Sequence, residues 1–306
     1  MPDKVERKIY FHIDFDSPEV LLKFYKINNI VFGKEELEKF YVKSFSRILD
    51  FLNKLNIKAS FFLVGNEIDT SPVIQNIVYK VHKAGHRIEN HTYSHPFGLA
   101  EMTENEILNE IINCSDIIEN ATGRRPVGFR SPGYSIDNRI IRILKENGFR
   151  YDSSGFWSVM NPILEYGHKY LFKNGLENKG FGYVTRKLPH EPYYPSSDNW
   201  QKNSKTSENF LEIPLPRTKL FGLPFYNNIN IWTPELYSQF IAGTIRRNSL
   251  VYLFHAIEFV DLSDNIPKEL SSHPNIKIPV KEKIKRSEKI LKTLLNRYAI
   301  SRTDHA

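Results

Sequence analysis

The 306 residues carry 42 Lys and Arg against 35 Asp and Glu, a formal net charge of +7, and 41% of them are hydrophobic. A chain of this length and composition can bury a large core, and one cysteine excludes an intrachain disulfide framework. No apolar run is long enough to cross a bilayer, and the charged start Met1–Lys8 lacks the apolar stretch of a secretion signal. We therefore expect a cytoplasmic protein.

Short apolar runs alternate with amphipathic segments from residue 9 to about 155. This alternation predicts βα units and a parallel sheet or barrel. Strands are expected at 9–15, 59–64, 127–129 and 149–152, and helices at 35–55, 73–83, 103–120 and 137–148. Thr103 and Glu106 form a capping-box pattern at a helix start, and Gly85 suits the left-handed position after a helix end.

Residues 156–235 differ in composition, with most of the tryptophans and many prolines. We interpret this segment as an insertion into a single domain spanning 1–306. A strand at 210–215, carrying Glu212, and an aromatic stretch at 220–232 are candidate walls of a substrate cleft. A helix at 234–246 and a strongly apolar strand at 250–254, which ends at His255, follow.

Much of the excess positive charge lies near the C-terminus, between Lys277 and Arg297. Apolar residues interleave with the lysines there, which predicts an amphipathic helix over about 278–299 with a solvated basic back. The charge favours an anionic partner, and peripheral contact with an anionic membrane is one use of such a helix. No nucleic-acid-binding motif accompanies it, so nucleic acid is not expected as a partner.

Two acids and two histidines indicate a metal site. Asp14 and Asp16 share one side of the first predicted strand with His12, because alternate residues of a strand face the same way. Buried carboxylates need a cation or hydrogen-bond donors. His91 and His95 are four residues apart, and one carboxylate with two imidazoles suits a catalytic Zn²⁺ or a similar divalent ion.

Three segments carry a resemblance to a known family: His91-Thr-Tyr-Ser-His95, Arg130-Ser-Pro132 and Leu253-Phe-His255. They resemble motifs of the polysaccharide deacetylases of the NodB-homology type, carbohydrate esterase family 4. The resemblance covers about 9–155 and 248–260 and implies a distorted (β/α)7 barrel with an insertion and a C-terminal helix. The split pair Asp14-Phe-Asp16 is similar to the branch that contains allantoinase-like and peptidoglycan-deacetylase-like cytoplasmic enzymes and lipid-linked aminoarabinose deformylases.

The resemblance also implies residue roles. The metal ligands would be Asp16, His91 and His95, holding one divalent ion, with zinc expected and iron, cobalt, nickel or manganese as alternatives. Asp14 would be the base, Arg130 would orient it, His255 would be the general acid, and Asp152 would correspond to a fourth catalytic motif. The substrate contacts implied are Pro132, Gly133, Tyr134 and Leu253, with a backbone N–H after Pro132 holding the oxyanion and Leu253 lining the acyl pocket.

The function expected from these roles is metal-dependent deacetylation of a small N-acetylated amino sugar. A nucleotide-linked or lipid-linked intermediate of cell-surface polysaccharide or lipopolysaccharide biosynthesis would suit a cytoplasmic enzyme. The alternatives are a deformylase or an allantoinase-like hydrolase of a cyclic amide or imide, using the same site. A metal-stabilised binding module without catalysis is a third alternative. The sequence does not fix the oligomeric state.

Overall fold

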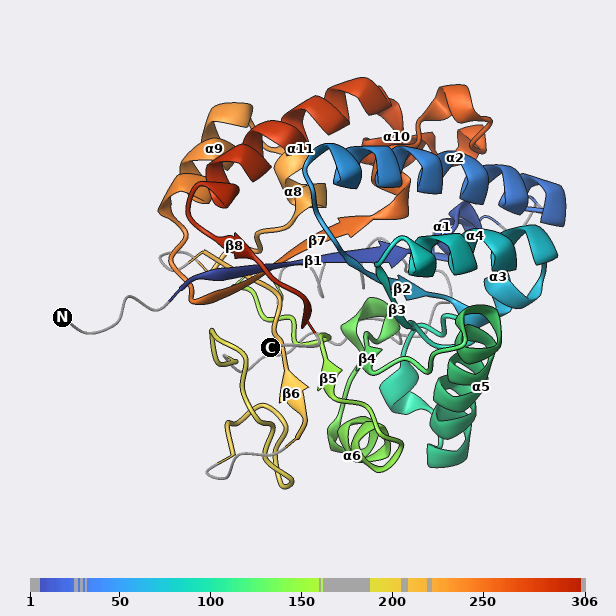
Figure 1. The fold of residues 1–306 in the computed structure, drawn as a ribbon, viewed down its shortest axis with the longest axis vertical. Coiled ribbons are helices and arrows are strands. Elements are labelled where there is room, and N and C mark those ends of the chain that lie inside the picture. The colour runs from blue at the N-terminus through green and yellow to red at the C-terminus, as the bar shows by residue number, and fades with distance from the viewer. Residues whose placement is uncertain are drawn as a thin grey trace.

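The architecture is a curled parallel sheet covered by helices, as the computed structural model shows for residues 6–24, 27, 30, 32–159, 161, 188–204, 209–218 and 222–303. Within these ranges, seven parallel strands curl into a half-barrel, so the predicted distorted (β/α)7 barrel is confirmed (Figure 1). The strand order is β6-β5-β4-β3-β2-β1-β7, and a short β8 pairs with β1. The strands are β1 (Lys8–Phe15), β2 (Ser60–Leu63), β3 (Arg87–Asn90), β4 (Gly128–Phe129), β5 (Tyr151–Asp152), β6 (Leu211–Glu212), β7 (Ser249–His255) and β8 (Ala299–Ile300).

Strand β1 is the second strand from one end of the sheet, between β2 and the last strand, β7. Its odd-numbered residues, such as Phe11 and Ile13, pack into the core beneath the outer helices. Because side chains alternate along a strand, His12 and Asp14 point to the inner side instead. Register places Asp14 beside His255 of β7, so two candidate catalytic residues are neighbours across the sheet.

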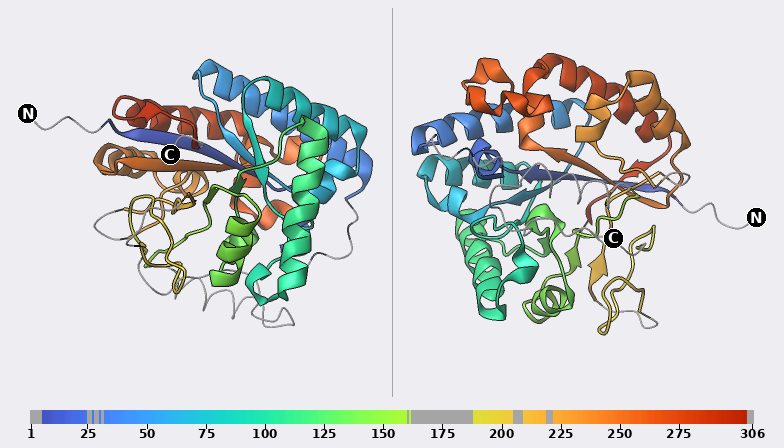
Figure 2. Two further views of the ribbon diagram at one scale, coloured as in Figure 1. Left: turned by 60° about the horizontal axis from the view of Figure 1, so that its bottom comes forward. Right: turned by 180° about the vertical axis from the view of Figure 1, so that it is seen from behind.

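The helices cover the outer face of the sheet (Figures 1 and 2). Apolar residues of α2, such as Phe45, Ile48 and Leu52, are buried in the same core as the outward residues of β1. The longer helices are α2 (Lys34–Lys54), α4 (Pro72–Lys83), α5 (Glu104–Thr122), α6 (Asn138–Glu146), α9 (Glu235–Thr244) and α11 (Val280–Leu295). The shorter ones are α1 (Pro18–Phe24), α3 (Gly65–Asp69), α8 (Asn227–Trp232) and α10 (Pro274–Lys277). No helix in the described ranges is both long and apolar enough to cross a membrane.

Several helix ends follow the predicted local chemistry. Thr103 Oγ1 accepts from the Glu106 N–H while Glu106 Oε2 accepts from the Thr103 N–H, which is the predicted capping box. Gly85 follows α4 with φ +87°, a left-handed conformation that costs glycine little. The helices α4 and α5 therefore begin and end within two residues of the predicted 73–83 and 103–120.

The segment predicted as an insertion, 156–235, contains a strand of the sheet itself. Strand β6 pairs with β5 in parallel, with Glu212 opposite Asp152, and Glu212 is fully buried. The strand predicted at 210–215 is present as the shorter β6, whereas the boundaries of the insertion stay a prediction. Residues 160, 162–187, 205–208 and 219–221 of this segment lie outside the described ranges. The single-domain assignment stays a prediction.

The predicted C-terminal helix is present as α11, somewhat shorter than the expected 278–299. Its apolar stripe is buried as predicted, with Ile290, Leu291 and Leu294 in the core. The interpretation that all its lysines are solvated is wrong for Lys283. The Lys283 side chain is buried and its Nζ donates to the carbonyl oxygens of Ile257, Val260 and Asn275, which satisfy all three donors.

Candidate metal centre

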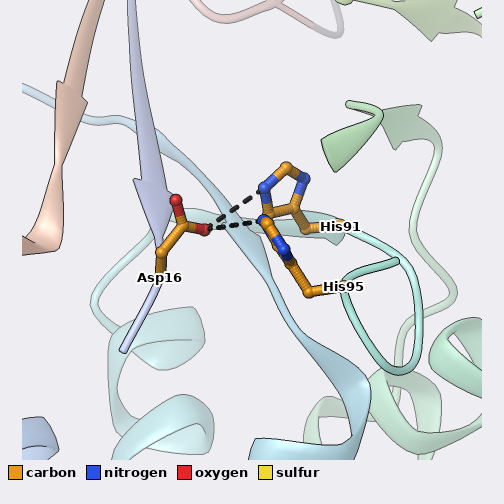
Figure 3. A group of neighbouring side chains, drawn as sticks. All are labelled: Asp16, His91 and His95. Carbon is orange, nitrogen blue, oxygen red and sulfur yellow. Dashed lines mark ion pairs between the residues drawn. The ribbon is translucent and has the colours of Figure 1, made fainter. Parts of the chain in front are cut away.

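Three predicted ligands converge at the carboxyl ends of the first and third strands. Asp16 Oδ1, just beyond β1, lies 3.3 Å from His91 Nε2 and 3.5 Å from His95 Nε2 (Figure 3). All three ligand atoms lie within 4.8 Å of one another. One carboxylate and two imidazoles facing a common point are a ligand set for one divalent ion.

The turn that follows β3 aims both histidines at this point. Thr92 and His95 adopt φ +65° and +55°, which is uncommon for residues with a Cβ. Side chains stabilise the turn: the Thr92 N–H donates to Asn90 Oδ1, and the His95 N–H donates to Thr92 Oγ1. Glu110 of α5 accepts from both the N–H and the hydroxyl of Ser94. Strain held by surrounding contacts is typical of functional sites.

The residues fit a bound divalent ion. His91 Nδ1–H donates to the Arg130 carbonyl oxygen at 2.7 Å, which leaves Nε2 as the lone-pair nitrogen on the side of Asp16. Burial opposes ionisation of Asp16, but the neighbouring His95 and His91 outweigh it and hold its pKa well below the usual range. Asp16 Oδ1 is buried and has no hydrogen-bond donor among the described residues. An anionic oxygen left in this way beside two imidazole nitrogens is well suited to a cation.

Asp14 lies beside the ligands and is held by a buried arginine. Arg130 Nε is 3.0 Å from Asp14 Oδ1, and both side chains are almost fully buried. Arg130 Nη2 donates to His12 Nδ1 at 2.6 Å and to Ser153 Oγ at 3.2 Å. Burial raises the pKa of Asp14, while Arg130 opposes the rise. Arg130 therefore fixes the position of the predicted base, and His12 contacts Arg130 and not the ligand cluster.

His255 approaches Asp14 from β7, with its Nε2 3.9 Å from Asp14 Oδ2. Its other nitrogen, Nδ1, is 3.3 Å from Glu258 Oε1. Burial lowers the pKa of His255, but the hydrogen bond to Glu258 and the charge of Asp14 outweigh it and raise the pKa to about 9. His255 is therefore protonated at neutral pH, which is the form that a general acid requires.

Glu258 belongs to a buried hydrogen-bond network that the sequence analysis missed. Asn227 Nδ2 donates to Glu258 Oε2, and Asn227 Oδ1 accepts from the hydroxyls of Tyr252 and Ser287. Helices α8 and α11 thus fix the carboxylate that contacts His255. Glu258 could have been recognised by its position three residues after His255, because one helical turn after the end of a strand brings residues i and i+3 to the same side of the chain.

A pocket with a cavity of about 190 Å³ opens over the ligands. Of the predicted substrate contacts, Gly133 and Tyr134 line it, whereas Pro132 and Leu253 do not. The remaining lining residues are Asp14, Asp16, Val20, Leu21, His91, His95, Phe97, Ser131, Tyr226, Asn228, His255, Ile257 and His273. Tyr226 and Asn228 belong to the stretch at 220–232 that was a candidate wall of the cleft. The apolar residues at 20, 21, 97 and 257 and the residue at 273 were not predicted, because they come from loops and helix ends whose sequence has no motif.

Asp152 lies beneath the pocket and does not line it. Its carboxylate accepts from the N–H and the hydroxyl of Ser154, and it faces Glu212 across the β5–β6 pair. Burial raises the pKa of both carboxyls, and their mutual repulsion adds to the rise at Glu212. The catalytic role of Asp152 stays a prediction. Its hydrogen bonds with Ser154 favour a structural role for the carboxylate over a catalytic one. Ser154 in turn accepts from the Ser131 N–H beside Arg130.

Comparison with known proteins shows which family the residues around the metal centre resemble. A family model described as polysaccharide deacetylase matches residues 37–151, which include His91, His95 and Arg130. Residues 37–151 of this chain are thus similar to the polysaccharide deacetylase family. The chain is 39% identical over 102 residues to a peptidoglycan-N-acetylglucosamine deacetylase of Bacillus cereus, an overlap of 33% of this chain and 36% of that protein. It is 35% identical over 101 residues to chitin deacetylase 1 of Cryptococcus neoformans, covering 33% of this chain and 21% of that protein.

Solved structures support the fold of this chain over nearly its whole length. The CE4 domain of a multidomain xylanase from the hindgut metagenome of Trinervitermes trinervoides matches with a TM-score of 0.50 and 15% identity, covering 98% of this chain and 89% of that domain. A CE4 family pseudoenzyme from Bacillus anthracis matches with a TM-score of 0.50 and 12% identity, covering 100% of this chain and 66% of that one. Since a pseudoenzyme shares the fold, activity has to be argued from the site residues.

Proposed function

We propose that this protein is a metal-dependent amide hydrolase that removes the acetyl group from an N-acetylated amino sugar. One observation carries the proposal: Asp14 and His255 lie 3.9 Å apart at the edge of the Asp16, His91 and His95 ligand cluster, in one pocket. A base, an acid and a metal site together are what amide hydrolysis requires. The sugar class is supported by the names of two relatives, which act on N-acetylglucosamine in peptidoglycan and on chitin.

The residues have separate tasks in this mechanism. Asp16, His91 and His95 would hold one divalent ion, which when bound supplies Lewis acidity to the amide carbonyl and to the attacking water. Asp14 takes a proton from that water, and Arg130 keeps the carboxylate in place. His255 donates a proton to the leaving amine, while its Nδ1 stays hydrogen-bonded to Glu258.

The turn after Arg130 supplies the donor for the developing oxyanion. Gly133 and Tyr134 both adopt positive φ, at +58° and +60°, which turns the backbone toward the pocket they line. The Tyr134 N–H already donates to the Ser131 carbonyl, whereas the Gly133 N–H has no acceptor among the described residues. We assign the oxyanion donor to the Gly133 N–H. Val20, Leu21 and Ile257 provide apolar surface for the acetyl methyl group.

The specific substrate and the cellular location expected from the sequence are kept as proposals. The chain spans about a sixth to just under a half of the length of the curated relatives it matches, so their polymeric substrates do not transfer directly. We propose a nucleotide-linked or polyprenyl-linked N-acetyl sugar, an intermediate of surface polysaccharide or lipopolysaccharide synthesis, used on the cytoplasmic side. The excess of positive charge supports a phosphate-bearing substrate. Zinc is the proposed ion, because two imidazoles and one carboxylate suit it.

An acetate-release assay tests the proposal. Purified protein reconstituted with Zn²⁺ is incubated with nucleotide-linked, polyprenyl-diphosphate-linked and free N-acetylglucosamine, and released acetate is measured. We expect acetate from at least one linked sugar, abolished by chelation and restored by added metal. Formate release from an N-formyl amino sugar, or ring opening of a hydantoin, without acetate release would instead assign the site to the alternative amide substrates.

A further inference from the structure

Helices α8 and α9 expose a cluster of large apolar side chains. The cluster consists of Trp232, Leu236, Tyr237 and Phe240. Leu236 is 83% exposed and Phe240 is 66% exposed, more than any other large hydrophobic residue in the described ranges. Single exposed apolar residues are ordinary, but a contiguous group on one surface marks an interaction site.

The cluster forms the outer face of an amphipathic helix. Leu236 and Phe240 are four residues apart on α9 and therefore project side by side. The opposite face of α9 is buried through Ser238 and Ala242. One face of α9 is therefore buried and the outer face is exposed and apolar, whereas the outer face of a surface helix is usually polar. We infer that the apolar outer face of α9 contacts a partner.

Helix α11 lies directly alongside α9 (Figure 1). Lys289 Nζ is 2.6 Å from Glu235 Oε1 at the start of α9. Near the other end, Arg297 donates to the carbonyl oxygens of Ala242 and Ile245. The two helices therefore run in the same direction and present one continuous outer surface.

Positive charge lies on the exposed face of α11, the helix that packs beside α9. Lys281, Lys285 and Lys292 are exposed and follow the spacing of one helical stripe. None of the three has a carboxylate partner among the described residues, whereas every acid on the two helices is paired. The pairs are Glu235 with Lys289, Glu282 with Arg286, and Glu288 with Lys54.

Apolar side chains on one helix and unpaired lysines on the next match the chemistry of an anionic bilayer. Such a surface inserts its apolar residues at the level of the headgroups while the lysines attract the lipid phosphates. A second copy of the chain fits less well, because a two-fold contact through this surface would bring two lysine stripes together. We propose that the α9–α11 surface, defined by Trp232, Leu236, Tyr237, Phe240, Lys281, Lys285 and Lys292, docks this protein on an anionic lipid bilayer.

The surface reaches the rim of the pocket. Trp232 Nε1 donates to Asn275 Oδ1 at 2.7 Å, and the Trp232 ring is 6.5 Å from that of His273, a pocket residue. Asn228, one helical turn before Trp232 on α8, also lines the pocket. Docking would therefore bring the pocket close to the bilayer surface, which suits a lipid-linked sugar; this last step rests on the proposed function.

Vesicle co-sedimentation tests the docking. The full chain is mixed with vesicles of phosphatidylcholine alone or with one-third phosphatidylglycerol. We expect binding to the phosphatidylglycerol vesicles that weakens as salt rises, because lysine attraction is screened. The double variant Leu236→Ser/Phe240→Ser should bind at least about tenfold more weakly, because it loses two large apolar side chains from the contact.

Two matched control variants test whether binding depends on where the substituted residues lie or only on their chemical type. Val42→Ser/Val73→Ser removes two exposed apolar residues from α2 and α4 and should bind vesicles as the wild type does. Lys285→Gln/Lys292→Gln should weaken binding and its salt dependence, whereas Lys80→Gln/Lys83→Gln, with the same change in net charge on α4, should do neither. Circular dichroism and thermal unfolding confirm that each variant folds.

The outcomes distinguish docking from catalysis. Asp14→Asn should bind vesicles as the wild type does, and Leu236→Ser/Phe240→Ser should keep wild-type turnover of a soluble N-acetyl sugar. Absence of wild-type binding to anionic vesicles overturns the proposal, as does equal binding by the α9 variant. A concentration-dependent dimer that the α9 variant abolishes would also overturn it, because the partner would then be a second copy.

Discussion

At the scale of single residues, the site depends on pairs in which one side chain fixes the state of another. Arg130 holds Asp14, and Glu258 holds His255. Both supporting residues are buried, so their charges act through a medium that screens them weakly. Arg130 and Glu258 are positioning residues in this account, because neither lines the pocket.

Glu258→Gln is expected to shift the pH dependence of turnover. His255 must be protonated to act as the acid, and the hydrogen bond to Glu258 contributes to a pKa of about 9. Removing the negative charge lowers that pKa, so the loss of activity on the alkaline side should begin about one pH unit lower or more. The pH profiles of kcat for the wild type and the variant measure the shift.

The control for that experiment is Glu282→Gln, which removes an exposed carboxylate on α11 that pairs with Arg286. Its pH profile should match that of the wild type. An unchanged alkaline limb in Glu258→Gln would mean that Glu258 has only a structural role and that another group sets the state of His255.

At the scale of elements, α11 supports the segment that follows the acid. His255 ends β7, and the next four residues form a 3₁₀ turn, Ala256–Phe259, that carries Glu258 and the pocket residue Ile257. Lys283 donates to the carbonyl oxygen of Ile257 within this turn and to that of Val260 directly after it. A helix remote in sequence thereby holds the acid end of the site.

Lys283→Met should destabilise the protein and reduce turnover. Methionine fills similar space but leaves three buried carbonyl groups without their donor, a loss of about 2–4 kcal/mol in the free energy of unfolding. Urea unfolding measures the loss. The control Lys281→Met replaces an exposed lysine two residues earlier, and it should change the free energy of unfolding by less than about 0.5 kcal/mol. Wild-type stability in Lys283→Met would show that the turn does not depend on this lysine.

At the scale of the whole molecule, the sequence predicts the features that depend on neighbouring residues or on a repeating apolar pattern. The long helices and β1 were placed to within a few residues because their apolar periodicity and caps are strong signals. His91 and His95 were recognisable because one turn holds both. The strand expected at 210–215 is present as β6, but its pairing with β5 was not predicted, because pairing depends on contacts between segments that are far apart in the sequence.

The rest of the site depends on contacts between distant segments. Tyr226, Asn228 and His273 reach the pocket from the C-terminal half, and only the closure of β7 beside β1 brings them there. Lys283 was taken for a solvated residue because it belongs to the run of lysines on α11, although it lies seven and eleven residues before Ile290 and Leu294 and so on their buried face. Burial of a charged group is decided by acceptors from other segments, which no helical pattern contains.

The central claim is that metal binding and proton transfer are carried by different aspartates two residues apart. Metal content and turnover measured on the same protein samples, for the wild type, Asp14→Asn and His91→Ala, test it most directly. We predict about one bound divalent ion per wild-type chain. Asp14→Asn should keep the ion and lose turnover by roughly 10²–10⁴-fold, whereas His91→Ala should lose both. Wild-type turnover in Asp14→Asn, or full metal content in His91→Ala, would contradict the account.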